Sequence, residues 1–535
     1  MTAVSDRAAI ELQRPGTPRP RLRPAAVDLG PALFVLANSI AFLIVRPGVN
    51  DLWAARARAS AAAHGVGLTY WFSWFGGGAT PGNYSVLTPY VSAVIGAEML
   101  GALCALAISA GAWLLLRGSA HPTAAAAVVA VGVSANLWSG RIPFLFGTLF
   151  AVLAFAAARA RRPALAAALG IVCVFCSPVA GAFLALGLGG TFISEPTKHY
   201  RRICLTTIAA VFVALVFVAV AFGNPGPENF SLWLTLELLG GLALCLLAKP
   251  APWVRTTIWL SFVVVVLLFL IPNGLGSNIM RWGWFYVPVA VVATSSRRLL
   301  ISLALVATLV GAGVQATVAD LINSSDPTST VAFYQPLARE LDTLPGLATY
   351  RLEVVAHGFS HGSHAGDEAL LNHAMLARGW ETQEDQALNA ILGSKSLDAV
   401  SFKAWLDNNA VGYVAIPRQQ VKSSPEYDII ADQTPGYLHQ IWQSVDWRLF
   451  RVSDASAVVQ APATVIARGQ ARLEVSIPCT CAIALRLRYS KFLQAQLVGS
   501  GIPARITNDG SGFSIVTTTR PGRYYLQGKL SGLFN

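Results

Sequence analysis

The segment ICLTTIAAVFVALVFVAVAF, residues 203–222, holds twenty consecutive uncharged residues and follows the basic run KHYRR at residues 198–202. A helix rises about 1.5 Å per residue, so a segment of this length reaches across the roughly 30 Å hydrocarbon core of a bilayer. A flanking basic run is typical of the cytoplasmic end of such a helix. The segment therefore predicts a helix that crosses a membrane from the inside outward.

The rest of the chain has the same character. Of its 535 residues, 54% are hydrophobic and only 12% are charged, with a mean hydropathy of +0.54. Soluble domains contain about twice that charged fraction. Eleven apolar segments predict transmembrane helices, and the pair on either side of Pro178 is the least sharply separated. Their ranges are 29–45, 90–116, 121–138, 143–159, 163–178, 179–194, 203–222, 231–248, 256–272, 281–295 and 299–316.

The placement of Lys and Arg predicts the orientation of these spans. If the amino terminus is inside, the inner turns carry most of the basic residues: Arg117, Arg159, Arg161, Arg162, Lys198, Arg201, Arg202, Lys249, Arg255, Arg297 and Arg298. Beyond the first loop, the outer turns carry only Arg141 and Arg281. An odd number of spans then places everything after about residue 317 outside the plasma membrane.

The net charge of +12 belongs to the membrane part. Residues 1–319 contain 21 Lys and Arg against 8 Asp and Glu, and residues 320–535 contain 18 against 19. Basic residues scattered between hydrophobic spans orient a membrane protein, whereas a nucleic-acid-binding protein gathers them into a stripe. We therefore expect no nucleic-acid partner.

These patterns predict four regions. Residues 1–28, rich in Pro and Arg, form a disordered cytoplasmic tail, and residues 29–316 form the helical membrane domain with a first outer loop at 46–89. No small-residue cleavage site follows the first apolar run, so that run predicts an uncleaved anchor. Helical and β-rich stretches alternate over residues 317–458 and predict an extracytoplasmic α/β domain. Short alternating strands over residues 459–535 predict an extracytoplasmic β-sandwich.

Asp51, in RPGVNDLWAARARA, is the only acidic residue of the first outer loop. A carboxylate at this position could act as a general base toward a hydroxyl group or as a metal ligand. Asn50 or Asp51 could equally cap the short surface helix that the following residues predict. Both interpretations remain open from the sequence.

Arg141, in NLWSGRIPFLFG, and Arg281, in GLGSNIMRWGWF, lie at outer span ends, against the general bias of basic residues toward the inside. A guanidinium group binds phosphate in a bidentate manner, so a lipid phosphate is one expected partner. Pairing with a carboxylate such as Asp51 or Glu228 is the alternative. Each stretch also contains an asparagine, Asn136 or Asn278, suited to a polar lining or to close helix contact.

Glu98 and Glu237 fall within predicted spans, where an ionisable side chain is costly and often functional. They could line a cavity, relay protons or form structural pairs. Glu228, in a short outer loop, could simply be solvated.

The first outer loop contains the aromatic stretch YWFSWFGGGATPGNYSVLTPY, residues 70–90. Trp71, Trp74 and Tyr84 are candidates for a surface that stacks on sugar rings or covers an isoprenoid tail. An interfacial aromatic belt is the alternative, although a belt does not explain the GGGATPG turn.

The remaining motifs indicate less. His357, His361, His364 and His373, near Asp367 and Glu368, could bind zinc, but their spacing fits a flexible polar loop better. Cysteines in apolar spans, including the Cys173-x-x-Cys176 pair, are expected to pack as small hydrophobic residues. Cys479 and Cys481 could form a disulfide or remain free thiols.

Taken together, these features resemble the GT-C superfamily of integral membrane glycosyltransferases, including mycobacterial-type arabinosyl- and mannosyltransferases. The resemblance is one of architecture: an acid in the first outer loop, many spans and an outer carboxyl-terminal region. Over most of the chain, the stretches WFGGGATPGNYSVLTPY, NLWSGRIPFLFG, CSPVAGAFLAL, GSNIMRWGW and ARGWETQED with FKAWLDNNAVGYVAIP are similar to a group of polytopic proteins of high-G+C Gram-positive bacteria, mostly of unassigned function.

The GT-C resemblance implies a polyprenyl-phosphate-linked sugar donor, a cell-envelope glycan or glycolipid acceptor and an inverting transfer outside the membrane. It implies that Asp51 deprotonates the acceptor while Arg141 or Arg281 holds the departing phosphate. Many such enzymes have paired acids where this chain has Asn50-Asp51, so a divalent cation, though conceivable, lacks that support. A transporter or flippase of lipid-linked sugars, suggested by Glu98 and Glu237, and a non-enzymatic envelope scaffold are the alternative functions.

Overall fold

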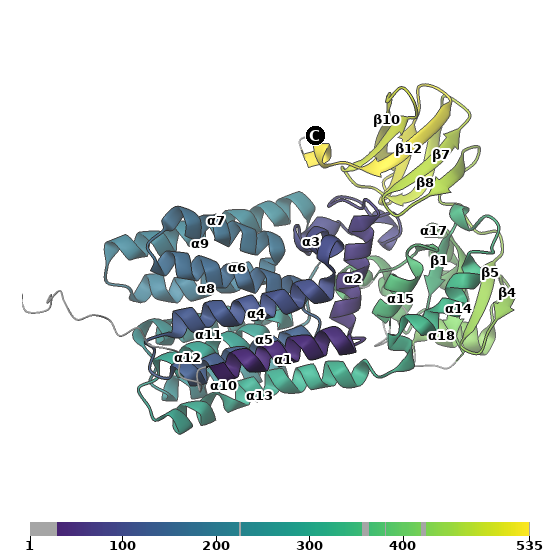
Figure 1. Ribbon diagram of the computed structural model, residues 1–535. Helices are drawn as coiled ribbons and strands as arrows, with labels where there is room; N and C mark the ends of the chain where they lie inside the picture. Colours follow the sequence, from purple (N-terminus) through teal and green to yellow (C-terminus); the bar gives the residue numbers. More distant parts are fainter. Residues whose placement is uncertain (1–28, 224–225, 356–362, 380, 419–423, 534–535) are drawn as a thin grey trace, which may run out of the picture.

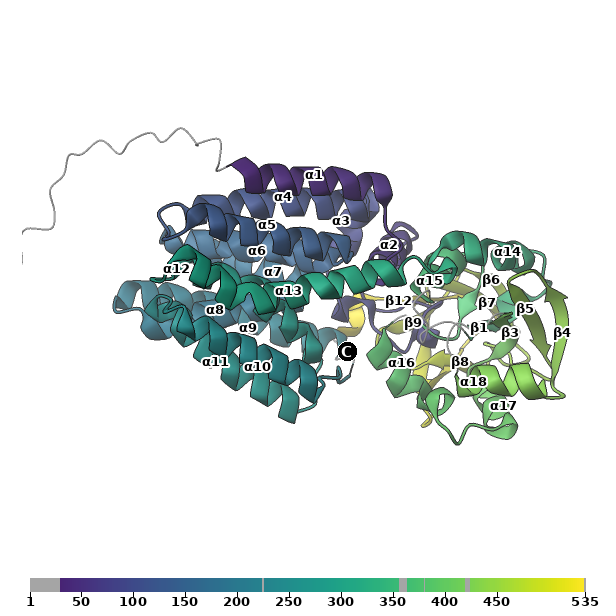
Figure 2. The same ribbon diagram turned by 90° about the horizontal axis from the view of Figure 1, so that it is seen from below.

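The structure is a computed structural model that describes residues 29–223, 226–355, 363–379, 381–418 and 424–533. A bundle of apolar helices leads into an α/β domain, and a β-rich domain lies beside both (Figures 1 and 2). The short helix α2 (Asn50–Ala63) lies between the bundle and the two other domains (Figure 1).

The bundle contains the most hydrophobic helices of the chain. They are α1 (Gly30–Val45), α3 (Thr88–Ile95), α4 (Ala97–Leu116), α5 (Pro122–Trp138), α6 (Ile142–Arg159), α7 (Pro163–Cys176), α8 (Pro178–Ser194), α9 (Lys198–Phe222), α10 (Leu232–Leu247), α11 (Pro252–Leu270), α12 (Val287–Thr294) and α13 (Leu299–Asn323). A proline in the first turn begins several of them, because that position needs no backbone hydrogen-bond donor.

Five of the described helices, α4, α6, α9, α11 and α13, are long and apolar enough to cross a membrane, and a sixth span results if α1 and α2 form one helix broken at a 69° bend. Four apolar helices are shorter: α5, α7, α8 and α10. Large apolar side chains such as Phe212 and Val213 of α9 face outward, as expected for contact with lipid. The predicted multi-pass membrane protein is confirmed, whereas the number of eleven spans stays a prediction.

Two predicted spans differ in detail from the structure. The span predicted at 90–116 is divided by Gly96, whose φ of +86° ends α3 before α4 begins. The span predicted at 281–295 begins with a π-helical turn, η5 (Trp282–Tyr286), that continues into α12. Close packing holds the bundle together: a Cβ on Gly190 of α8 would lie 1.9 Å from Oγ1 of Thr257 on α11.

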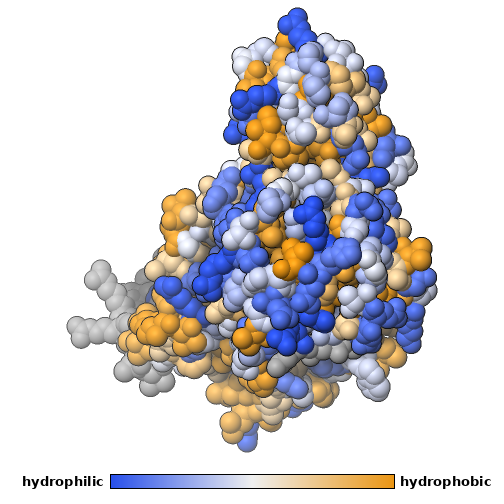
Figure 3. Space-filling model, turned by 90° about the vertical axis from the view of Figure 1, so that its right-hand side faces the viewer, coloured by the Kyte–Doolittle hydropathy of each residue, from blue (hydrophilic) through white to orange (hydrophobic). Residues whose placement is uncertain are grey.

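The α/β domain is built on a five-stranded sheet with the order β2-β1-β3-β5-β4. The strands are β1 (Arg351–Val354), β2 (Met375–Leu376), β3 (Val411–Pro417), β4 (Leu438–Gln443) and β5 (Trp447–Val452). The first three are parallel and the last two are antiparallel to their neighbours. The surrounding helices are α14 (Val331–Leu341), α15 (Ser363–Leu370), α16 (Thr382–Asn389), α17 (Ala399–Asn408) and α18 (Pro425–Asp428). Figure 3 shows that hydrophilic residues predominate over this side of the molecule.

The carboxyl-terminal region is β-rich, as predicted, and its seven antiparallel strands have the order β6-β7-β12-β9-β10-β11-β8. They are β6 (Thr464–Arg468), β7 (Arg472–Ile477), β8 (Ala482–Arg488), β9 (Leu493–Leu497), β10 (Pro503–Asn508), β11 (Phe513–Thr517) and β12 (Gly522–Gly528). Alternate residues of β7 and β8 are buried in a core that also includes Tyr70 and Phe72 of the first loop and Met375 and Ala410 of the α/β domain. Cys479 and Cys481, left open by the sequence, form a disulfide before β8.

Candidate functional site

Asp51 lies in the first turn of α2, at the end of the bundle that faces the other domains. The N-cap of this helix is Val49, and no side chain caps it, so neither Asn50 nor Asp51 makes the capping hydrogen bond that the alternative interpretation required. A carboxylate in the first turn is stabilised by the helix dipole. Its side chain is 38% exposed and therefore accessible to a ligand.

Arg141 and Arg281 both approach this carboxylate. Nε of Arg141 lies 3.6 Å from Oδ2 of Asp51, and Nη2 of Arg281 lies 3.8 Å from the same oxygen. We call these two arginines the guanidinium pair. The structure thus brings together three residues that the sequence places 90 and 140 positions apart.

The backbone explains the position of Arg141. Gly140 has a φ of +73°, and a Cβ at this position would lie 2.5 Å from the backbone nitrogen of Leu52. Only glycine allows the turn before α6 to approach α2 so closely. The approach places the next residue, Arg141, beside Asp51.

Arg281 is positioned by a different feature of the backbone. It immediately precedes the π-helical turn η5, a kind of irregularity that often redirects side chains at functional sites. Its guanidinium carbon lies 5.3 Å from the centre of the Phe144 ring, and this cation–π contact stabilises the position of the side chain.

A fourth charged residue, Asp320 near the end of α13, was missed by the sequence analysis. Its Oδ2 lies 3.4 Å from Nη2 of Arg141, so two aspartates flank this guanidinium group. The sequence feature that could have indicated Asp320 is an acidic residue directly after the last apolar segment, on the same predicted side of the membrane as Asp51. The predicted domain boundary at residue 317 placed it in the outer domain instead.

Arg141 is buried but incompletely satisfied. Its side chain is only 10% exposed, and no described residue accepts a hydrogen bond from its Nε or Nη1. Burial, followed by the positive charge of Arg281, lowers the pKa of Arg141 to about 10, which leaves the group charged at neutral pH. Buried donors without partners are uncommon, and a guanidinium group in this state is well suited to bind an anion.

The predicted polar neighbours lie at different depths. Tyr84 is 37% exposed as a whole residue, whereas its hydroxyl group is desolvated, and this desolvation, followed by the charge of Asp51, raises the pKa of the hydroxyl. Asn278 lies in the short helix η4 (Gly276–Ile279), three residues before Arg281. Asn136 donates a hydrogen bond of 2.8 Å to the carbonyl of Gly132 and lines the apolar cavity described below.

Trp71 and Trp74 do not offer an open stacking surface. Both indoles are 0% exposed, and their ring centres lie 4.9 Å apart in a core shared with the α/β domain. Trp71 donates a hydrogen bond of 2.9 Å to Gln470, close to β7. In this structure the two indoles pack between the aromatic loop and the α/β domain, and their expected sugar-stacking role stays a prediction.

Glu98, Glu237 and Glu228 each contact a side chain outside the proposed site. Glu98 is in the first turn of α4 and accepts hydrogen bonds of 2.9 and 2.5 Å from Arg56 of α2. Glu237 lies on the exposed surface of α10, 3.4 Å from the indole nitrogen of Trp284. Glu228 is part-buried and accepts a hydrogen bond from Ser277 at 3.2 Å. None of the three belongs to the lining of the apolar cavity.

The histidine cluster gives no metal site among the described residues, which contain no group of three metal-binding side chains. His357 and His361 lie outside the described residues. His373 contacts Asp342 at 2.8 Å.

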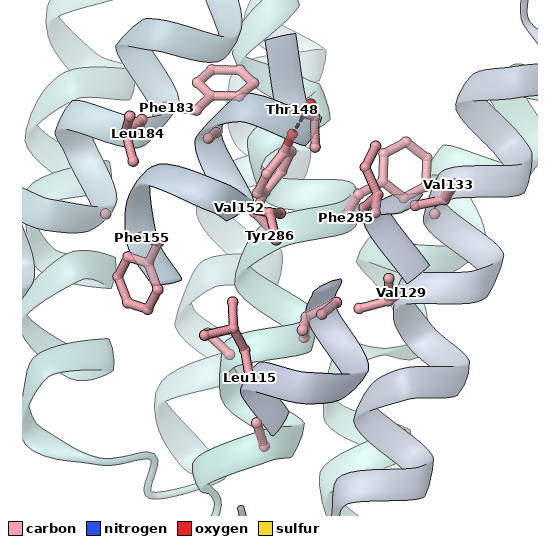
Figure 4. Close-up of a pocket in the computed structure, with 18 of the residues that line it drawn as sticks. Leu115, Val129, Val133, Thr148, Val152, Phe155, Phe183, Leu184, Phe285 and Tyr286 are labelled. Carbon is pink, nitrogen blue, oxygen red and sulfur yellow. Dashed lines mark hydrogen bonds between the residues drawn. The ribbon is translucent and has the colours of Figure 1, made fainter. Parts of the chain in front are cut away.

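An apolar cavity of about 290 Å³ lies within the bundle (Figure 4). Side chains from α4, α5, α6, α8, η5 and α12 line it, including Leu115, Val133, Phe155, Phe183 and Phe285. Phe144 belongs to this lining and its ring lies 5.3 Å from the guanidinium carbon of Arg281, so one end of the cavity lies close to the guanidinium pair. Inside it, Tyr286 and Thr148 form a hydrogen bond that satisfies both hydroxyls.

Comparisons with known proteins give one point of reference. No family model and no curated protein matches the chain. Among solved structures, the cryo-EM structure of the arabinofuranosyltransferase AftD from Mycobacteria is similar, with 12% sequence identity and a TM-score of 0.44. The similar region covers 79% of this chain and 40% of that chain, so this protein spans less than half the length of AftD.

Proposed function

We propose that this protein is a membrane glycosyltransferase of the GT-C type. It transfers a sugar from a polyprenyl-phosphate-linked donor to a cell-envelope glycan or glycolipid, on the outer face of the plasma membrane. The observation that carries the proposal is the buried Arg141, two of whose nitrogens have no hydrogen-bond acceptor among the described residues, close to an apolar cavity.

The donor fits this arrangement in two parts. Its phosphate binds the guanidinium pair, where the donors of Arg141 find acceptors and the second positive charge adds to the attraction. Its isoprenoid tail lies in the apolar cavity, whose aliphatic and aromatic lining replaces lipid around it. Phe144, which contacts both, marks the junction of headgroup and tail.

Asp51 performs the proton transfer. Its carboxylate accepts the proton of the acceptor hydroxyl while that oxygen attacks the anomeric carbon of the donor. The bond between this carbon and the phosphate oxygen breaks, and the electron pair leaves with the phosphate. The guanidinium pair stabilises the charge that develops there.

Asp320 orients Arg141 rather than taking part in bond changes. Its carboxylate oxygen lies 3.4 Å from Nη2 of Arg141, while Asp51 lies 3.6 Å from Nε of the same guanidinium group. The two aspartates each face an arginine, and the described residues offer no third metal-binding side chain nearby. The proposal therefore routes no step through a cation.

The proposal is tested in membranes that contain the purified protein, with a radiolabelled polyprenyl-phosphate sugar and a panel of envelope oligosaccharide acceptors. Asp51→Asn should abolish transfer while donor binding remains, and Arg141→Met should weaken donor binding. The matched control is Glu237→Gln, on the outer surface of α10, which should preserve both. Unchanged transfer by Asp51→Asn would exclude Asp51 from the reaction.

The transporter and scaffold alternatives gain no specific support. Glu98 and Glu237, which suggested proton coupling, lie away from the cavity lining. A scaffold has no need of a half-exposed carboxylate beside an unsatisfied buried arginine.

A further inference from the structure

A second cavity, of about 580 Å³, lies where the bundle meets the α/β domain. Its walls come from the end of α1, the first half of α2, the start of α4, α14, and α15 with the residues that follow it. Helices α2 and α15 lie side by side in both views, so the two domains bound the cavity together (Figures 1 and 2). We call it the interface cavity. Polar side chains predominate in its lining: Arg46, Arg56, Glu98, Gln335, Glu368 and Asn372.

The charged groups of the interface cavity are only partly paired. Nη2 of Arg56 lies 2.5 Å from Oε1 of Glu98, and the guanidinium carbon of Arg56 lies 4.3 Å from the centre of the Trp53 ring. Nε of Arg46, at the exposed end of α1, donates to a backbone carbonyl of its own helix, and this arginine has no acidic partner among the described residues. On α15, no described residue donates a hydrogen bond to the buried Oε2 of Glu368. The cavity therefore offers an unpaired cation and an incompletely satisfied carboxylate.

This combination of groups favours a neutral ligand that is rich in hydroxyl groups. Glu368 needs hydrogen-bond donors and Arg46 needs acceptors, and a hydroxyl group can serve as either. The carboxylates of Glu98 and Glu368 disfavour an anion, and the two guanidinium groups disfavour a cation. The amide groups of Gln335 and Asn372 add further donors and acceptors. The volume falls within the usual range of ligand-binding cavities, and a carbohydrate has the required chemistry.

The interface cavity borders the part of the bundle that faces lipid. Ile44 and Val45, directly before Arg46, are 76% and 61% exposed, and Met99, directly after Glu98, is 42% exposed. Helices α1 and α4 pack against each other in one hydrophobic cluster, so these apolar side chains belong to a common outer surface. In a membrane such a surface contacts acyl chains. A ligand in the cavity can therefore keep its own acyl chains in the bilayer.

The interface cavity and the proposed site share the first turn of α2. Asp51 faces the guanidinium pair, whereas Trp53 donates an indole hydrogen bond of 2.8 Å to the carbonyl of Ser329, between α13 and α14. Helix geometry places the α carbons of residues two positions apart at about 5 Å from each other. A saccharide in the interface cavity is thus held within one helical turn of the proposed base.

We propose that the interface cavity binds the saccharide headgroup of a neutral glycolipid and that this glycolipid is the acceptor of the reaction. Hydroxyl groups of the headgroup bind Glu368 and Arg46, and the acyl chains lie along the outer ends of α1 and α4. The inference rests on the proposed function and narrows it, because it selects the membrane-anchored acceptor over a soluble glycan.

The test measures binding to the full-length protein in a sugar-free detergent, by native mass spectrometry. The probes are glucosyl-, galactosyl- and mannosyl-diacylglycerol, compared with diacylglycerol and with the corresponding free sugars. At least one glycolipid should bind roughly tenfold more tightly than diacylglycerol and than its own free sugar, because headgroup and acyl chains then contribute together.

Two variants locate this binding. Gln335→Trp introduces a large ring into the cavity from the surface of α14, and Glu368→Met removes the carboxylate without shortening the side chain. Each should weaken glycolipid binding by roughly tenfold, through lost space or a lost charged acceptor. The matched control, Ala332→Trp, adds the same ring to an exposed position of α14 that does not line the cavity, and it should bind like the native protein. Binding of a polyprenyl phosphate should be unchanged in all three, which excludes a general loss of structure.

Glycolipids that bind no better than diacylglycerol, or a Gln335→Trp protein that binds them like the native protein, overturn the inference. A free sugar that binds as tightly as its glycolipid would overturn the choice of a membrane-anchored acceptor and indicate a soluble glycan.

These outcomes differ from a failure of the proposed function, since binding requires no transfer. If the protein transfers sugar but Gln335→Trp leaves the KM for the acceptor unchanged, only the role of the interface cavity is refuted. If glycolipid binding depends on Gln335 and Glu368 as described but no sugar is transferred, only the proposed reaction is refuted.

Discussion

Two carboxylates interact with the guanidinium group of Arg141, and these interactions determine the charge balance of the proposed site. Asp51 lies 3.6 Å from Nε and Asp320 lies 3.4 Å from Nη2, while Nη1 has no acceptor among the described residues. When Asp51 takes up a proton, Arg141 keeps one anionic partner and gains attraction for a phosphate. The site is therefore arranged so that base catalysis and stabilisation of the leaving group reinforce each other.

Asp51→Asn and Asp320→Asn are expected to differ in magnitude. Loss of the proposed base should lower the transfer rate by about 10²–10⁴-fold, and loss of a charged hydrogen-bond partner of Arg141 should lower it by roughly tenfold. Initial rates with a lipid-linked sugar donor measure both. Equal losses in the two variants would contradict the division of roles between the aspartates.

Glu381→Gln is expected to stabilise the protein in a pH-dependent manner. Burial raises the pKa of Glu381 from about 4.5 to about 8 on folding, so the folded protein keeps a proton that the unfolded chain releases. The stability of the native protein should therefore fall as the pH rises from about 4.5 to about 8, whereas the variant lacks this loss. The difference in Tm between the two proteins should be near zero at the acidic end and greatest above about pH 8. A constant difference over this range would exclude a raised pKa.

At the level of elements, the proposed site depends on irregular segments, and contacts with neighbouring elements hold these segments in place. The turn at Gly140 seats Arg141 against α2, and the π-helical turn η5 directs Arg281. From the α/β domain, Gln383 donates a hydrogen bond to Glu228 in the loop before α10. Each depends on one local feature, so each can be tested separately.

Arg378→Met should be strongly destabilising. The change leaves Asp385, Glu353 and Glu426 buried without their cation, and loss of one partner of a buried ion pair costs about 3–5 kcal/mol. The matched control is Lys403→Met, which removes a more exposed pair with Asp407 and should cost less than about 0.5 kcal/mol. Unfolding of the purified protein compares the two. Similar losses in the two variants would show that the buried ion pairs of Arg378 contribute little to the stability of the protein.

Val152→Phe should fill part of the apolar cavity and weaken binding of a long polyprenyl phosphate by roughly tenfold, because the added ring occupies space proposed for the tail. Binding of a short isoprenyl phosphate should change little. Val213→Phe, on the exposed face of α9, adds the same ring outside the cavity and serves as the control. If both variants bind the long lipid like the native protein, the tail lies elsewhere.

For the whole molecule, the proposed function depends on which side of the membrane the α/β and β-rich domains occupy. The bundle, α2, the α/β domain and the β-rich domain meet around the aromatic loop, where Tyr70 donates a hydrogen bond of 2.9 Å to the carbonyl of Arg488. The proposed site lies at the end of the bundle that faces these domains (Figure 1). The proposed reaction needs that end to be outside.

Cysteine labelling tests this orientation. The five free cysteines of the described residues are buried and should not react, which provides a low background. Val400→Cys, on the surface of α17, should react with a membrane-impermeant maleimide on intact cells. Arg162→Cys, in the turn between α6 and α7, should react only after permeabilisation. The reverse pattern would invert the topology and remove the proposed reaction from the outer face.

The membrane character of this protein, its β-rich carboxyl-terminal region and the three candidate residues Asp51, Arg141 and Arg281 could all be predicted from the sequence. These features are local: apolar length, alternation along a strand, and a charge at an unexpected span end can each be recognised within a short window. The number of spans is not fixed by composition, because a bend or a short helix changes how many apolar segments cross the membrane.

Which charges meet and which aromatic residues are buried depends on the tertiary structure. Asp320 lies beside Arg141, and Trp71 and Trp74 are buried in a shared core, because contacts between distant segments are set by packing rather than by sequence spacing. An indole in a loop has the same local signature whether it faces a sugar or a domain interface. Long-range burial, which no local pattern encodes, makes that distinction.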